Sequence, residues 1–365
     1  MQQLLHHIAT NSKIDLSDPD YQGIDKIKYP NLNSAVLFCK AWLSDQKEFL
    51  INTSGSTGVP KLIELERELM KTSAKKTVQA LQLPQKSNFL VCLNTEYIAG
   101  KMMLVRGLEH NMNLYVVEPS INPFDPIPQS IIIDFAALVP LQIESIIDQA
   151  GNALNILNNM KAVIVGGAPI SHSLQLKIEK LNAPVYATYG MTETISHIAL
   201  KKLNGNDKSD RYIVLEGIVV GQDERGCLTI KGDITHNELL VTNDLVDLID
   251  RNQFVWLGRA DNIINSGGVK VIPEIVEEKI ASVFTQLDLD HQFFITSAPD
   301  EKLGQKVVLL IEGETFNTTF LNKMLQEALL KYQTPKEISF IKRFEYTSTD
   351  KLNRSATIAN HLKSK

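Results

Sequence analysis

The segment TSGSTGVPK, residues 53–61, combines residue types that suit phosphate binding. It follows the apolar run 49–51, which predicts a strand that ends in a loop rich in N–H and O–H donors. Glycines let the backbone approach a phosphate closely, hydroxyl groups donate to its oxygens, and a lysine contributes a positive charge. We therefore expect a polyphosphate cradle formed by Thr53, Ser54, Gly55, Ser56, Thr57, Gly58 and Lys61.

The spacing of this segment differs from that of the ordinary P-loop, because Lys61 follows Pro60 rather than a glycine. A cluster of serine, threonine and glycine is also typical of a surface turn. The complete order of hydroxyls, glycines, proline and lysine favours the phosphate cradle, and further polar motifs downstream add to it.

Two of these motifs follow short apolar runs. The run 162–165 precedes a glycine turn, and the run 185–188 precedes a tyrosine and a glutamate. Ligands of parallel sheets lie at the carboxyl ends of strands, so we expect both motifs at one site. A tyrosine beside a glycine turn leaves a flat slot for a purine, and a carboxylate beside phosphate oxygens suits Mg²⁺. The residues of the two motifs are Gly166, Gly167, Ala168, Tyr189, Gly190, Met191, Thr192 and Glu193; the simpler alternative is a strand-end tyrosine and an exposed glutamate.

The elements that must position these motifs alternate along the chain. Such alternation predicts βα units around a mainly parallel sheet. We expect helices over 33–43, 67–83, 98–108, 140–150 and 171–181, and strands over 49–51, 89–93, 114–117, 131–133, 162–165 and 185–188.

The remainder of the chain has two further patterns. Residues 201–253 contain short β-branched runs separated by turn signals, which predicts an antiparallel β subdomain. Beyond it, helices over 273–284 and 318–331 and strands over 292–296, 306–311 and 337–341 predict a small α+β unit. With 365 residues the chain is long enough for two domains. The predicted fold is α/β, with a large N-terminal domain over 1–260 hinged to a small C-terminal domain over 261–365.

Composition limits the possible partners. The chain is 44% hydrophobic and 22% charged with a net charge of -5, which gives no reason to expect nucleic-acid binding. Cys39, Cys92 and Cys227 lack metal-type spacing and are expected in the core. No apolar run is long enough to span a membrane, so we expect no membrane insertion, a cytoplasmic location and small-molecule partners, with a homo-oligomer left open.

Taken in order, the motifs at 53–61, 166–169, 189–193, 242–246, 257–268 and 347–354 resemble those of the acyl-adenylate-forming (AMP-binding) superfamily. This superfamily includes acyl-CoA synthetases, luciferases and adenylation domains of peptide synthetases. The resemblance extends over most of the chain from Leu50 to Arg354. It implies an enzyme that uses ATP and Mg²⁺ to activate a carboxylic acid as an acyl-adenylate.

The resemblance also implies roles for individual residues. The turn at Gly166–Gly167–Ala168 and Tyr189 enclose the adenine, Thr192 contacts the α-phosphate, and Glu193 helps to hold Mg²⁺. The remaining implied roles are ribose contacts at Asp244 and Arg259, a hinge pivot at Asp261, a channel for the thiol acceptor at Gly267 and Gly268, and catalysis by Lys351.

Several positions depart from the family pattern. Asn243, Asn265 and Asp350 replace the usual glycine, lysine and glycine. Tyr97, three residues before Gly100, stands where many relatives carry a histidine beside the acyl pocket. That departure makes Lys101, Arg106 and His197 candidates for contacting a second carboxylate on the acyl group. A solvated helix charge remains the ordinary alternative for Lys101 and for Arg106.

Only about fifty residues precede the cradle, fewer than in typical members. With the motifs YIAGKMM and YGMTETISHIA, this favours the short o-succinylbenzoate-CoA ligases of menaquinone synthesis, whose acyl group carries two carboxylates and whose acceptor is CoA. Three alternatives stay open: another aryl- or acyl-CoA ligase, an adenylation enzyme that loads a carrier protein, and a nucleotide-binding regulatory protein without catalysis.

Overall fold

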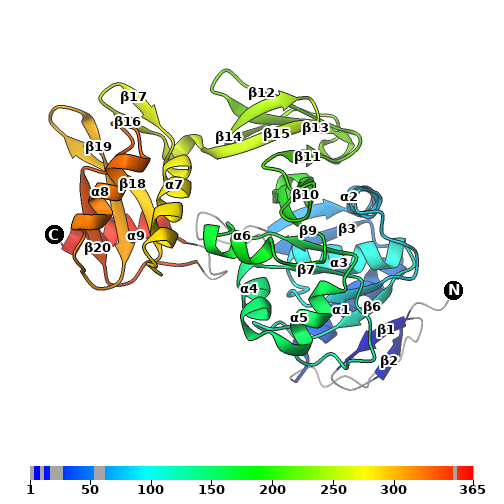
Figure 1. The fold of residues 1–365 in the computed structure, drawn as a ribbon. Coiled ribbons are helices and arrows are strands. Elements are labelled where there is room, and N and C mark those ends of the chain that lie inside the picture. Colours follow the sequence, from blue (N-terminus) through cyan, green and yellow to red (C-terminus); the bar gives the residue numbers. More distant parts are fainter. Residues whose placement is uncertain (1–3, 9–11, 17–27, 53–61, 348–351, 365) are drawn as a thin grey trace.

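The structure is a computed structural model that describes residues 4–8, 12–16, 28–52, 62–347 and 352–364. The predicted phosphate cradle, residues 53–61, and the predicted catalytic Lys351 lie outside the described residues. Figure 1 shows a larger unit that carries the N-terminus and a smaller unit that carries the C-terminus.

Six parallel strands form the centre of the larger unit. Their order in the sheet is β9-β8-β7-β5-β6-β1, and every neighbouring pair is parallel. All four residues of β7 and of β8 are buried, as expected for a sheet with helices on both faces. The strands are β1 (Leu4–His7), β5 (Asn88–Val91), β6 (Asn113–Val116), β7 (Phe135–Leu138), β8 (Ala162–Val165) and β9 (Val185–Gly190).

The two faces of this sheet contribute to two separate hydrophobic clusters. Phe89 and Val91 of β5 pack with α1 (Pro30–Leu43), α2 (Arg67–Ala80) and α3 (Ile98–Glu109). Leu90, between them, points to the opposite face, which packs with α4 (Pro140–Gln149), α5 (Gly151–Asn158) and α6 (His172–Ile178). This alternation within one strand confirms the predicted α/β architecture.

The order of the strands also predicts where a ligand binds. From β5 the chain continues to β6 on one side and then to β7 on the other side of β5. In open α/β sheets, ligands bind beyond the carboxyl ends of the strands at such a reversal. The loops after β5, β7, β8 and β9 are therefore the expected walls of the site.

The predicted antiparallel strands after residue 201 are present. They do not form a separate sheet, because β10 pairs with β9 and β11 pairs with both β10 and β15, so one 13-stranded sheet results. Figure 1 shows β12 to β15 beyond the end of the parallel strands. The strands are β10 (His197–Lys202), β11 (Tyr212–Val214), β12 (Ile218–Gln222), β13 (Cys227–Gly232), β14 (Leu240–Asp250) and β15 (Gln253–Arg259).

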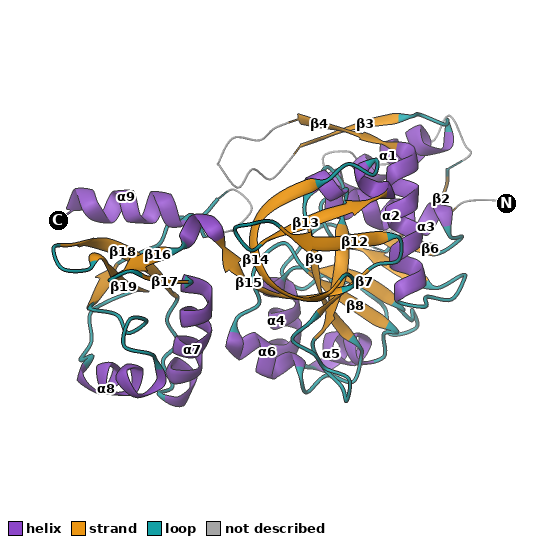
Figure 2. Cartoon of the chain, turned by 90° about the horizontal axis from the view of Figure 1, so that it is seen from above, coloured by secondary structure: helices purple, strands orange, loops and turns teal. Residues whose placement is uncertain are grey.

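The strand predicted over 49–51 does not belong to the main sheet. It is β3 (Glu48–Asn52), whose one partner among the described strands is β4 (Leu62–Glu66), in an antiparallel hairpin. Phe49 packs against Phe38 and Trp42 of α1, with ring centroids 5.0 Å and 5.2 Å away. The hairpin therefore pairs Asn52 with Leu62 and lies beside α1 (Figure 2).

The smaller unit contains its own five-stranded sheet. Its strands are β16 (Ile264–Ser266), β17 (Val269–Val271), β18 (Phe293–Asp300), β19 (Gly304–Glu312) and β20 (Glu337–Ile341). Its helices are α7 (Pro273–Gln286), α8 (Thr319–Ala328) and α9 (Arg354–Ser364), of which α9 was not predicted. The short helix η3 (Ala260–Asn262) connects the two units, and the predicted boundary at 260/261 falls within it.

Three local predictions were wrong or incomplete. Residues 131–133 are not a strand; β7 begins at Phe135, and Ile132 is 67% exposed. Ala150, with φ 54°, ends α4 and starts the separate helix α5. The strands β1 and β2 (Ser12–Asp15) were not predicted, because their side chains are mixed in polarity. Within the described residues, none of the helices is long and apolar enough to cross a membrane.

Candidate functional site

The glycine turn after β8 is shaped by its neighbour β9. A Cβ atom on Gly166 would lie 2.2 Å from Oγ1 of Thr188, so the turn has no room for a side chain there. Gly167 has φ +87°, which favours glycine. Gly167 is exposed, and the turn lies beside the strand that carries Tyr189, where we predicted the purine slot.

Tyr189 is held at both ends of its side chain. Its ring packs edge-on against Tyr212 and Phe254, with centroids 5.7 Å and 5.1 Å away. Its hydroxyl donates a hydrogen bond of 2.7 Å to Oδ2 of Asp244. Burial, together with the neighbouring carboxylate, raises the pKa of Tyr189, so the hydroxyl stays protonated as a donor.

Asp244 is buried and hydrogen-bonded at both carboxylate oxygens. Oδ1 accepts from Nε1 of Trp256 at 3.2 Å, and Nη1 of Arg259 lies 3.6 Å from the same oxygen. Two predicted ribose contacts, Asp244 and Arg259, are thus adjacent. Trp256 was not predicted as a site residue. It lies on β15, which pairs with the strand of Asp244, so predicting this hairpin would have placed Trp256 near Asp244.

Thr192 and Glu193 lie in a short helix, η1 (Thr192–Thr194), directly after β9. The backbone is tight on both sides of this helix. On one side, a Cβ on Gly190 would lie 2.3 Å from the carbonyl oxygen of Ser196. On the other side, Ile195 has φ 64° and ψ -52°. The Ser196 N–H donates across Ile195 to Thr194 O at 2.6 Å. That is a strained γ-turn, and such strain concentrates at functional sites.

The side chain of Glu193 is exposed. Among the described residues, no group of three His, Cys, Asp or Glu side chains could hold a metal ion. A single carboxylate nevertheless fits Mg²⁺, which keeps several waters and binds substrate phosphates with one or two protein carboxylates.

Arg106 is not a solvated helix charge. The residue is 2% exposed. Its Nη2 donates to Oγ of Ser196 at 3.0 Å, and its Nη1 lies 3.7 Å from Sδ of Met103. Its Nε has no hydrogen-bond partner among the described residues. Burial lowers its pKa from 12.5 to about 9, which leaves the guanidinium charged at neutral pH. No carboxylate in the described part of the chain pairs with it, so this buried cation suits an anionic ligand.

His197 lies beside this cation. Its Nε2 is 3.0 Å from Oγ1 of Thr77, whose hydroxyl already donates to Ser73 O at 3.1 Å. Thr77 therefore accepts from Nε2–H. Burial, and then the charge of Arg106, holds the pKa of His197 well below its usual value, so the ring is neutral.

The other predicted acyl-pocket residues lie at the start of α3. A Cβ on Gly100 would lie 2.4 Å from Asn94 O, which explains the glycine where α3 meets the loop after β5. Lys101 donates to Glu96 O at 2.8 Å, and Tyr97 is 37% exposed. The structure therefore brings Arg106 and His197 together and gives Lys101 a local partner instead.

The predicted hinge and the region around Lys351 have well-defined contacts. Arg259 Nη2 lies 2.7 Å from Oδ2 of Asp261. Gly267 and Gly268, with φ +59° and +80°, form the exposed turn between β16 and β17. Near the other predicted motif, Arg354 donates from both Nη atoms to the two carboxylate oxygens of Glu277, at 2.9 Å and 2.7 Å.

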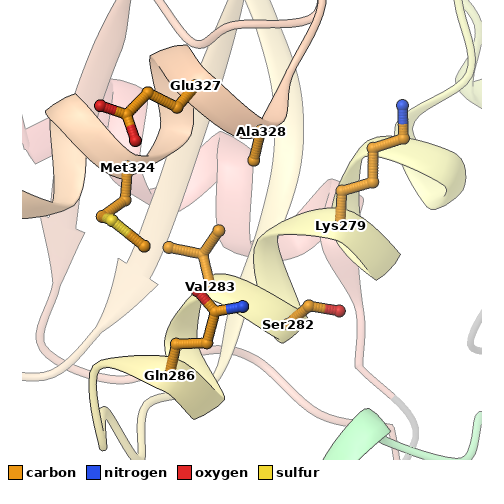
Figure 3. Close-up of a pocket in the computed structure, with 7 residues that line it drawn as sticks. All are labelled: Lys279, Ser282, Val283, Gln286, Met324, Glu327 and Ala328. Atoms are coloured by element: carbon orange, nitrogen blue, oxygen red, sulfur yellow. The ribbon is translucent and has the colours of Figure 1, made fainter.

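Two surface pockets formed by the described residues contain none of the predicted site residues. One, of about 410 Å³, lies between α7 and α8 and is lined by Lys279, Val283, Met324 and their neighbours (Figure 3). The other, of about 620 Å³, includes Glu118 and Asp125 after β6. Neither provides the aromatic face and buried cation described above.

Comparison with known proteins gives the following similarities. A family model described as AMP-binding enzyme matches residues 29–223. The chain is 25% identical over 323 residues to the 2-succinylbenzoate–CoA ligase of Lactococcus lactis subsp. lactis (strain IL1403), covering 84% of this chain and 69% of that protein. It is 23% identical over 333 residues to the protein of the same name from Oceanobacillus iheyensis, covering 84% and 68%.

Two solved structures are similar as well. An acyl-CoA synthetase (AMP-forming)/AMP-acid ligase II-like protein from Dyadobacter fermentans is 44% identical, with a TM-score of 0.62 and coverage of 91% of this chain and 94% of that one. The o-succinylbenzoate CoA synthetase of Bacillus subtilis, solved with the acyl-adenylate intermediate, has a TM-score of 0.70 at 20% identity, covering 84% and 68%. The second likeness concerns the fold alone.

Proposed function

Because this chain belongs to the AMP-binding enzyme family, we propose that it is an AMP-forming acid–thiol ligase that joins 2-succinylbenzoate to CoA. We choose this acid because Arg106 is buried and charged and has no carboxylate partner among the described residues. A second carboxylate on the substrate could be that partner. The names of the relatives support the same choice. The reaction would belong to menaquinone synthesis and take place in the cytoplasm.

The proposed chemistry has two steps. In the first, a carboxylate oxygen of the acid attacks the α-phosphorus of ATP and pyrophosphate leaves, which forms an acyl-adenylate. In the second, the CoA thiol attacks the acyl carbon, loses its proton and displaces AMP. The first step brings two anions together, so catalysis depends on positive charges and donors that are already in place.

We assign the nucleotide to the side of the site formed by β8, β9 and β14. The adenine would lie between the Gly166–Gly167 turn and Tyr189, and the ribose hydroxyls would donate to Asp244. The segment 53–61 and Thr192 would donate hydrogen bonds to the phosphates, and Lys61 and Lys351 would neutralise part of their charge. Mg²⁺ held at Glu193 would supply further neutralisation of the phosphate charge.

We assign the acid to the side formed by α3 and the turn after η1. The activated carboxylate would face the α-phosphate, and the second carboxylate would pair with Arg106. A guanidinium can bind a carboxylate through two parallel hydrogen bonds, and Nε and the Nη atoms of Arg106 offer this geometry. The neutral ring of His197 would complete the wall without adding a competing charge.

The smaller unit would supply the parts that change between the two steps. We propose that Asp261 is the pivot, that Lys351 serves adenylation, and that the turn at Gly267 and Gly268 lines the path of the thiol. A hinge of this kind needs a few residues at element ends that absorb large changes of φ and ψ. The short helix η3, at the end of β15, is the segment that we propose for this role.

The test is ATP-dependent pyrophosphate release with a panel of acids, with and without CoA. We expect a single burst with 2-succinylbenzoate alone and steady turnover when CoA is added. Steady turnover with a different acid would keep the ligase assignment and exclude 2-succinylbenzoate. ATP binding without pyrophosphate release for any acid would contradict both.

A second prediction concerns nucleotide affinity. Tyr189→Phe keeps the aromatic face but removes the hydroxyl that donates to Asp244. Since a hydrogen bond to a charged group contributes about 1.5–3 kcal/mol, we expect AMP to bind roughly tenfold or more weakly by calorimetry. Tyr186→Phe, on the same strand, is the matched control and should leave AMP affinity unchanged. Equal affinities for both variants would exclude this role for Tyr189.

A further inference from the structure

Asn243 and Asp244 are consecutive residues of β14, so their side chains point to opposite faces of the strand. Asp244 faces Tyr189 and Trp256, on the side assigned to the nucleotide. Asn243 faces the connection between the two units, where its Nδ2 lies 3.3 Å and 3.4 Å from the two carboxylate oxygens of Asp261. One peptide unit thus carries both the ribose contact and a contact to the hinge.

The orientation of the Asn243 amide is set by Arg225, in the turn between β12 and β13. Nη1 of Arg225 donates to Oδ1 of Asn243 at 2.9 Å, and Nη2 donates to Thr242 O at 3.0 Å. Nε donates to Asp223 at 2.8 Å, which fixes the guanidinium. Since Oδ1 of Asn243 is taken by Arg225, its NH₂ group is left to donate to Asp261.

Arg259 completes the network. Its Nη2 pairs with Asp261 at 2.7 Å, and its Nη1 lies 3.6 Å from Asp244. A ribose bound at Asp244 would draw Arg259 toward the nucleotide. Arg259 would then no longer donate to Asp261. Asn243 would be the remaining side-chain donor to Asp261 among the described residues.

We propose that Asn243 and Arg225 are positioning residues that hold the ribose-binding Asp244 and the hinge residue Asp261 in one unit. The inference rests on the proposed roles of Asp244 and Asp261, and it adds two residues to which no role has been assigned. It also gives a reason for asparagine at a position where the resembled family carries glycine. Asn243 is not among the residues with positive φ, so glycine is not required there by the backbone.

The first variant is Asn243→Asp. The new carboxylate can still accept from Arg225, but it faces the carboxylate of Asp261 and repels it. We expect the hinge contact to open. The second variant combines Asn243→Asp with Asp261→Asn, which exchanges the donor and the acceptor and should restore the contact. Asp261→Asn alone shows the effect of losing the ion pair with Arg259.

The readout is the distance between the two units, measured with spin labels in the presence of AMP. Cysteines introduced at the exposed positions Asn155 and Gln326 take the labels, because Cys39, Cys92 and Cys227 are buried. Asn243→Asp should reduce the population at the parent distance at least threefold. The double variant should recover it to within about twofold of the parent. Asn206→Asp, in an exposed loop, controls for the added charge and should have no effect.

Amide hydrogen exchange gives a second, local readout. The Ile263 N–H donates to Ala260 O within the hinge, so its exchange should accelerate in Asn243→Asp and recover in the double variant. An unchanged distance distribution and exchange rate in Asn243→Asp would overturn the proposal, as would a double variant no closer to the parent than the single variants. These measurements require AMP but no acid or CoA, so they stand apart from the choice of substrate.

Discussion

Lys351→Ala is expected to slow acyl-adenylate formation by roughly two orders of magnitude or more. The proposed role of Lys351 is to neutralise the charge between the attacking carboxylate and the α-phosphate. Loss of one preorganised donor from such a site costs on the order of 3 kcal/mol in the barrier. Pyrophosphate release in a single turnover with acid and ATP measures this step directly.

Thioester formation should suffer far less in the same variant. If the smaller unit rotates between the steps, Lys351 is withdrawn before the thiol attacks, so supplied acyl-adenylate and CoA should still react. Lys342→Ala, an exposed lysine of the same unit, is the control for a general loss of charge. The idea fails if Lys351→Ala turns over supplied acyl-adenylate and CoA no faster than acid with ATP.

The described residues that follow Lys351 in the sequence are held by contacts within the smaller unit. Leu352 forms a bridge with Tyr346, Asn353 N donates to Glu345 O, and Arg354 pairs with the half-buried Glu277. Burial raises the pKa of Glu277 against the opposing effect of Arg354. The chain is therefore attached to the smaller unit directly after Lys351, as a lysine that moves with this unit requires.

Arg106→Met is expected to lower activity toward 2-succinylbenzoate while it raises the stability of the protein. Truncating one partner of a buried charge pair costs about 2–5 kcal/mol, so kcat/KM for 2-succinylbenzoate should fall by about two orders of magnitude. An aromatic monocarboxylate without the second carboxyl group should be affected far less. The comparison of kcat/KM for the two acids is the measurement. Loss of selectivity in Lys101→Met instead would transfer the role to Lys101.

The same substitution should stabilise the protein without substrate. Replacing a buried ionic group with an apolar side chain of similar size often gains about 1–4 kcal/mol, and Met103 already lies beside Arg106. Urea unfolding at neutral pH checks this. An equal loss of stability and activity would indicate a structural role.

The pH dependence of this gain has a defined sign. Burial lowers the pKa of Arg106 from 12.5 to about 9 in the folded chain. Below pH 9 the side chain is charged in both the folded and the unfolded chain, so the full penalty of burying the charge applies. Above pH 9 the folded chain begins to release the proton and the penalty shrinks. The stability gained in Arg106→Met should therefore be largest near neutral pH and decline above about pH 9.

Local motifs explain why much of the candidate site could be proposed from the sequence. The turn at Gly166–Gly167 and the residues after Val185 each follow a β-branched run. The run and the polar motif after it can both be recognised within a few residues of sequence. Strand 131–133 was misplaced because three isoleucines have high β-propensity, yet the small residues of β7 fit the buried position between β5 and β8. Packing decided that case rather than propensity.

The sequence by itself determined the proposed chemistry of the nucleotide side, because the motifs that we expect to contact phosphate, purine and ribose are short and follow a fixed order. Only the tertiary structure decided that Arg106 is a buried cation with no carboxylate partner among the described residues, while Lys101, on the same helix, has a local partner. It also brought Arg225, Asn243 and Asp261 together from three segments. Burial and pairing depend on what packs against a residue from distant parts of the chain, and local sequence does not contain that information.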